Sequence, residues 1–122
     1  AVISAAAAGD LSITKSLCPS VITENGMLTY TFTVQNYGNT AITAADNAVI
    51  TDNFDPILSD LTVKFNGTAW TSETDYTYDG ATGAFATVAG RLTVPAATYR
   101  RDTDGKLILT PGVSILTVTG TV

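Results

Sequence analysis

Residues 28–36, "LTYTFTVQN", form the most regular stretch of the sequence. From Leu28 to Val34 every second side chain is apolar or aromatic, namely Leu28, Tyr30, Phe32 and Val34, and Asn36 ends this row. The side chains between them are threonine or glutamine. A period of two residues predicts a β-strand with one face in a core and the other toward water. The stretch runs into "NYGN" at 36–39, whose Asn and Gly residues tolerate positive φ and predict a turn.

Strands of the same kind are predicted on both sides of this stretch. The segment 11–17 alternates strictly and carries Lys15 in its apolar row. Further strands are predicted at 47–53, 60–66, 91–95 and 113–122, with hairpin turns at 66–67, 79–80 and 102–105. No segment has a convincing helical period.

Short strands punctuated by turn signals predict an all-β fold. We expect an antiparallel β-sandwich with Ig-like connections and about seven to nine strands. A chain of 122 residues fits one domain. We expect that domain to span residues 11–122, and residues 1–10 to be a linker or a processed N-terminal segment.

The composition argues against several classes of function. A net charge of −5 and a pI near 4.2 match phosphate backbones poorly, so we expect no nucleic-acid partner. The apolar segment 1–8 is too short to span a bilayer and no basic amphipathic segment is present, so we expect no direct membrane insertion. The absence of histidine removes His-based catalysis and nearly all catalytic zinc sites. We therefore expect a protein that is not an enzyme.

Residues 11–56 resemble the DUF11 family, an Ig-like repeat of bacterial and archaeal surface proteins. The family pattern has a lysine, a glycine, a tyrosine, Asn-x-Gly, Thr-Asp and a proline in that order; the matching residues here are Lys15, Gly26, Tyr30, Asn36, Gly38, Thr51, Asp52 and Pro56. Pro111-Gly112 and the strand after it look like the closing turn and strand of the family. The middle of the chain, residues 66–110, fits the pattern more loosely.

The resemblance implies a structural role outside the cell. We expect a non-catalytic module, a stalk or spacer or a fibre subunit, of an exported protein on a bacterial cell, spore or appendage surface. Its partners would be neighbouring DUF11-type domains or identical subunits, with residues 1–8 adding to a neighbour's sheet edge as one route. The alternative is an adhesin domain that binds a glycan or a protein ligand.

Lys15 is the first candidate site residue, because a lysine in an apolar row must pair, react or reach back to water. Asn36 ends the apolar row of the best strand, and Asp52 ends the third predicted strand. One hypothesis is an intramolecular isopeptide bond from Lys15 to Asn36 or Asp52. The other is a buried ion pair between Lys15 and Asp52, with Asn36 bonded to the backbone of a turn.

Oxygen-bearing side chains also gather between residues 34 and 55. Calcium prefers six to eight oxygen ligands, and Asp52, Asn53 and Asp55 could supply a weak partial site. Asp46 is too far along the chain to join them, because a strand of about six residues separates its ends by roughly 20 Å. The alternative is that these side chains shape turns by bonding to the backbone.

Two further features have alternative interpretations. Trp70, Tyr76 and Tyr78 could form an aromatic platform for a ligand such as a sugar, but the same spacing serves a core. Cys18, the only cysteine, could form an intermolecular disulfide or behave as an inert buried thiol.

Overall fold

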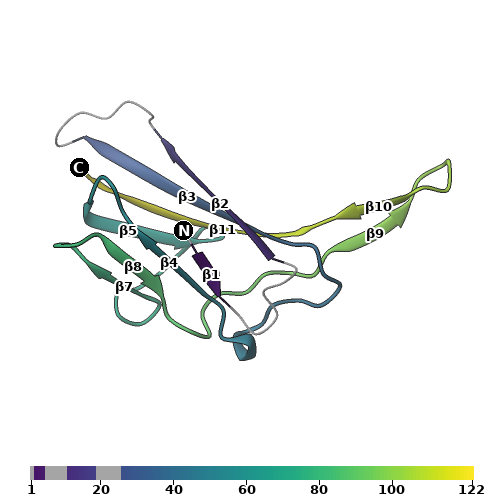
Figure 1. Cartoon of the computed structure of the whole chain (residues 1–122), viewed down its shortest axis with the longest axis horizontal. Helices are drawn as coiled ribbons and strands as arrows, with labels where there is room; N and C mark the ends of the chain where they lie inside the picture. The colour runs from purple at the N-terminus through teal and green to yellow at the C-terminus, as the bar shows by residue number, and fades with distance from the viewer. Residues whose placement is uncertain (1, 5–10, 19–25) are drawn as a thin grey trace.

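The structure is a computed structural model that describes residues 2–4, 11–18 and 26–122. Its strands form two facing sheets and a separate hairpin (Figure 1). In spatial order the first sheet contains β2 (Leu11–Cys18), β3 (Met27–Asn36), β11 (Gly112–Thr121), β5 (Ser59–Phe65) and β6 (Thr68–Ala69). The second contains β1 (Val2–Ser4), β4 (Val49–Asn53), β8 (Ala84–Thr87) and β7 (Tyr76–Asp79).

All strand pairs within these sheets are antiparallel. The predicted all-β antiparallel sandwich is therefore confirmed. β3 lies between β2 and the central strand β11 of the first sheet, and it pairs along its whole length with β11, from Asn36 opposite Gly112 to Met27 opposite Thr121. A short 3-10 helix, Ala44–Asp46, lies between β3 and β4. Within the described residues, no helix has the length and apolar character needed to cross a membrane.

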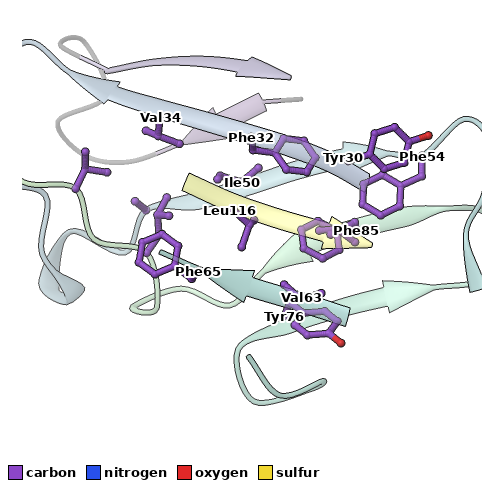
Figure 2. Close-up of a cluster of buried hydrophobic side chains, with 14 of the residues drawn as sticks. Tyr30, Phe32, Val34, Ile50, Phe54, Val63, Phe65, Tyr76, Phe85 and Leu116 are labelled. Carbon is purple, nitrogen blue, oxygen red and sulfur yellow. The ribbon is translucent and has the colours of Figure 1, made fainter. Parts of the chain in front are cut away.

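The core lies between the two sheets, as Figure 2 shows. The inward row of β3 meets residues of β4, β8 and the loop after β4, and its aromatic members stack in a chain. Phe54 joins the two sheets, because its ring centroid lies 4.7 Å from that of Tyr30 and 5.2 Å from that of Phe85. Phe85 in turn stacks on Tyr76 at 5.6 Å. Burial of each such ring contributes about 1.5–3 kcal/mol.

The predicted turns form where the sequence places them. Asn66 and Gly67 have φ of 49° and 84°, the left-handed values needed for a two-residue turn between β5 and β6. The short strand predicted at 91–95 is wrong: only Val94 bridges, to Ile42, and Pro95, which has no amide hydrogen to donate, follows it directly.

The hairpin predicted around residues 102–105 forms, but it joins neither sheet. β9 (Thr98–Arg101) and β10 (Leu107–Thr110) pair only with each other among the described strands. Figure 1 shows this hairpin projecting from one end of the sandwich. We call residues 98–110 the arm.

Residues 2–4, expected in a linker or processed segment, form β1 and pair with the edge of β4 in the same chain. Ile3 lies opposite Ile50 in that register. The strand thus extends the four-stranded sheet by one short member.

Candidate functional site

Lys15 and Asp52 form a contact that joins the two sheets. Lys15 belongs to β2 of the first sheet, and Asp52 belongs to β4 of the second. The Lys15 Nζ lies 2.5 Å from the Asp52 Oδ2, and the two side chains are 25% and 8% exposed. The sequence hypothesis that placed these two residues together therefore describes a real contact, and it is an ion pair between strands of different sheets.

Aromatic rings surround the ammonium group of Lys15. Its Nζ lies 4.4 Å from the ring centroid of Tyr30, 5.7 Å from that of Phe54 and 5.9 Å from that of Phe32. The register explains this position, because Lys15 lies directly opposite Phe32 on the inward face. Ring faces attract a cation, and the attraction grows when the cation is partly desolvated. We call Lys15, Asp52, Tyr30, Phe32 and Phe54 the clasp.

Tyr30 connects the clasp to the loop after β4. Its hydroxyl donates a hydrogen bond to the carbonyl oxygen of Pro56 at 3.0 Å. Burial raises the pKa of Tyr30 to about 12, with the negative charges of Asp55 and Asp52 adding to the effect. Tyr30 therefore stays neutral and keeps its hydrogen-bond donor at any physiological pH.

Asn36 does not take part in the clasp. It lies opposite Leu11, four residues along β2 from Lys15, which corresponds to roughly 13 Å of strand. Its Nδ2 donates to the carbonyl oxygens of Thr40 at 2.9 Å and Pro95 at 3.2 Å, and its Oδ1 accepts from the amide of Gly38 at 2.9 Å. The geometry thus excludes Asn36 as the partner of Lys15 and leaves Asp52 as the only one of the two predicted acceptors in contact.

Asn36 instead fixes the base of the arm. Its side chain is 1% exposed, and its three hydrogen bonds tie the turn after β3 to the segment that enters β9. Gly112, opposite Asn36, passes so close to Pro95 that an added Cβ would lie 1.8 Å from the Pro95 oxygen. The amide of Ala97 also donates to the oxygen of Gly38 at 2.8 Å. The Asn-x-Gly and Pro-Gly motifs therefore meet at one place.

The three proposed calcium ligands do not converge. Asp52 and Asn53 are neighbours in β4, so their side chains point to opposite faces of the sheet. Asp52 faces inward to Lys15, whereas Asn53 and Asp55 are exposed. No group of three or more His, Cys, Asp or Glu side chains suited to a metal is present within the described residues.

Asp46 and Asn47 shape a turn, as the alternative interpretation held. The Asp46 Oδ2 accepts a hydrogen bond from the amide of Thr43 at 2.7 Å, and Asn47 has a φ of 52°. These are local contacts between side chain and backbone, typical of helix and turn ends.

The three aromatic residues proposed as a platform are used inside the fold. Tyr76 is 6% exposed and stacks on Phe85. The Tyr78 hydroxyl donates to the oxygen of Leu58 at 2.6 Å and accepts from its amide at 3.1 Å. Trp70 stacks on Phe65 at 4.9 Å. The core interpretation of this spacing is therefore the one that the geometry supports for Tyr76 and Tyr78.

Cys18 ends β2, where its backbone lies opposite Thr29. Its side chain falls outside the described part of the structure, so the disulfide hypothesis stays a prediction.

Sequence reasoning missed a groove on the outer face of the four-stranded sheet. The cavity has a volume of about 410 Å³. Its floor is made by Ala84 and Ala86 of the middle strand β8. The register places Ala84 between Asp79 and Asn53, and Ala86 between Thr77 and Thr51, so small side chains are flanked on both sides by longer ones. The sequence carried a signal for this groove, because residues 84–87 alternate alanines that face outward with Phe85 and Thr87, which face inward.

Glu73 and Asp79 give the groove its charge. Both carboxylates line it, and neither forms an ion pair with a cationic side chain of the described residues. Asp79 accepts one hydrogen bond, from the amide of Ala81 at 2.9 Å. The groove is therefore a concave acidic surface with a small apolar floor.

Comparison of the chain with protein-family models, with curated proteins and with solved structures finds no match in any of the three. The resemblance to DUF11 therefore rests on the residues quoted above, and the function is argued from the structure.

Proposed function

We propose that this chain is a non-catalytic structural module, a stalk element or fibre subunit, of an exported bacterial surface protein. The observation that carries the proposal is that its candidate reactive side chains are engaged in contacts within the fold. Lys15, Asp52 and Asn36, the residues that sequence reasoning singled out for chemistry, all bond within the fold. Lys15 and Asp52 join one sheet to the other, and Asn36 joins the sandwich to the base of the arm.

The architecture supports the same role. The clasp ties strands of opposite sheets, so pulling the sheets apart must break an ion pair and its aromatic surroundings together. The long pairing of β3 with β11 runs through the middle of the first sheet. Strands that pair over many residues resist separation cooperatively, because the backbone hydrogen bonds of the ladder lie side by side. A module of this kind suits transmission of load along an extended protein.

The alternative, a ligand-binding adhesin, has less support. Tyr76 is buried and Tyr78 is bonded to the backbone, so the proposed aromatic platform is not assembled. Glycan-array binding that is lost on Trp70→Ala would revive the adhesin proposal.

Location on the cell tests the main proposal. Intact cells of the source organism are treated briefly with protease, and the released peptides are compared with those from lysed cells. We expect peptides of this chain in the first fraction, and immunogold labelling to place the chain on surface fibres or layers. Release only after lysis would refute the proposal.

A further inference from the structure

The arm exposes apolar side chains that the sandwich does not cover. Leu107, Tyr99 and Leu109 are 60%, 50% and 40% exposed. The register places Tyr99 opposite Leu109 and Arg101 opposite Leu107, so these four side chains share one face. An isolated two-stranded hairpin is at best marginally stable in water, and an apolar face on such a hairpin indicates a partner.

The arm also differs in charge from the rest of the chain. Residues 98–110 contain Arg100, Arg101 and Lys106 against Asp102 and Asp104, a net charge of +1. The remaining residues contain three cationic and nine acidic side chains, a net charge of −6. Asp102 is largely occupied in the turn, where its Oδ1 accepts from the amides of Asp104 and Lys106. The arm is thus a basic, apolar projection from an acidic body.

The groove has the complementary properties. It is concave where the arm is a projection, and its floor is apolar at Ala84 and Ala86. Glu73 and Asp79 line it, and a third acidic residue of the lining, Asp52, turns its carboxylate inward to Lys15. Figure 1 shows the arm leaving one end of the sandwich and β7 and β8 near the other end. The arm of one molecule therefore points away from its own groove, and the two can meet only between molecules.

We propose that the arm of one copy of this chain docks in the groove of a second copy. The apolar face of the arm, with Tyr99 and Leu109, packs on the alanine floor. Arg101 lies beside Glu73 and Asp79 of the second copy. This inference rests on the proposed structural function and names its partner.

The symmetry of the contact determines what it builds. Arm and groove are different surfaces, so the interface is heterologous, and each copy keeps one free arm or groove after pairing. Successive copies then join head to tail into a ring or an open filament. The contact joins oppositely charged surfaces, so it weakens as salt rises.

The first experiment measures assembly of the purified full chain by sedimentation velocity and negative-stain electron microscopy over a range of concentrations. We expect species larger than a dimer that grow with concentration and shrink with added salt. An arm variant, Leu107→Ser/Leu109→Ser, and a groove variant, Ala84→Arg/Ala86→Arg, are each expected to lose assembly. Met27→Ser is the matched control, because Met27 is 57% exposed but lies on β3.

Mixing the two variants gives the sharper result. The arm variant keeps its groove and the groove variant keeps its arm, so an equimolar mixture should form 1:1 dimers that grow no further. Charge exchange provides a second check: Arg101→Glu and Glu73→Lys should each reduce assembly, and the double variant Arg101→Glu/Glu73→Lys should restore it. Thermal melts of every variant show that loss of assembly is not loss of folding.

Several outcomes would overturn the inference. A wild-type chain that stays monomeric at every concentration would do so, as would assembly of either variant alone to the wild-type extent. Binding of the arm to vesicles of anionic lipid without self-assembly would assign the arm to a membrane instead. These results are independent of the surface-location test, because a surface-located chain that does not assemble would leave the proposed function standing and remove only this contact.

Discussion

Gly112→Ala tests whether the base of the arm is held as the structure shows. The added Cβ would lie 1.8 Å from the oxygen and 2.5 Å from the carbonyl carbon of Pro95. Real Cβ atoms essentially never approach another heavy atom within 3.0 Å, so the two backbone segments must separate by about 1.2 Å. Both are backbone atoms of ordered segments, which cannot move aside as a side chain can.

The separation has a second consequence at Asn36. The Pro95 oxygen accepts a hydrogen bond of 3.2 Å from the Asn36 Nδ2, and Asn36 is 1% exposed. Losing that bond in a buried site costs about 1–3 kcal/mol. Overpacking costs a further 1–3 kcal/mol or so, offset by roughly 0.5 kcal/mol from the stiffer unfolded chain. We expect a loss of about 3–4 kcal/mol in the free energy of unfolding.

The assay is urea unfolding at equilibrium, followed by tryptophan fluorescence from Trp70 and by circular dichroism. Gly80→Ala is the matched control, because its added Cβ meets only the Tyr78 Cε2, at 4.0 Å, and should change stability by less than about 0.5 kcal/mol. Gly120→Ala is intermediate, since its Cβ would lie 2.8 Å from the Leu58 Cβ. A Gly112→Ala variant as stable as Gly80→Ala would show that the reasoning about the arm base is wrong.

Four further predictions concern the clasp and the proposed metal site. Lys15→Met is expected to lower the free energy of unfolding by about 2 kcal/mol, because it removes the cation and leaves the Asp52 carboxylate without the positive charge of Lys15. The Lys15 side chain is 25% exposed, so water weakens the ion pair only in part. The intact mass of the purified chain should equal the sequence mass, and a mass lower by one water would show an amide bond between Lys15 and Asp52. The folded pKa of Tyr30 is about 12 against an ordinary 10.0, so its contribution to stability is complete below pH 10 and declines between about pH 10 and pH 12. Tyr30→Phe should flatten that part of the plot of unfolding free energy against pH. An unchanged plot would argue against the burial of the hydroxyl. Melting temperatures with calcium and with a chelator should be equal, since the proposed ligands point apart, and a rise of several degrees with calcium would contradict this geometry.

The alternating rows show why much of the fold could be predicted. In β3 the pattern of apolar and polar residues specifies which face is buried, and the register follows once that face must meet a core. The turn at Asn66 and Gly67 is local chemistry, because both residues adopt positive φ. The strand predicted at 91–95 failed because a short apolar run by itself does not distinguish a strand from an irregular segment.

The site was predicted only in part. Lys15 was identified because a charge in an apolar row needs a partner, and Asp52 was identified because it ends a strand. The hypothesis that bonded Asn36 to Lys15 is wrong, since separation along β2 and β3 becomes known only when the strands are paired. The alternative, with Asn36 bonded to the backbone of a turn, agrees with its hydrogen bonds to Thr40 and Gly38. Its actual partners, Thr40, Pro95 and Gly38, include one that is distant in sequence.

The sequence by itself determined most of the strands, the inward rows, the turns and the need of Lys15 for a partner, because each depends on side chains a few residues apart. Only the tertiary structure decided that Lys15 meets Asp52 across the sheets, that Asn36 holds the base of the arm, and that the hairpin 98–110 stands outside the sandwich. The same holds for the groove, whose two alanines and the carboxylates of Glu73 and Asp79 come from two strands and a loop. Those features depend on which segments pack together, and packing is set by the whole chain and not by any local pattern.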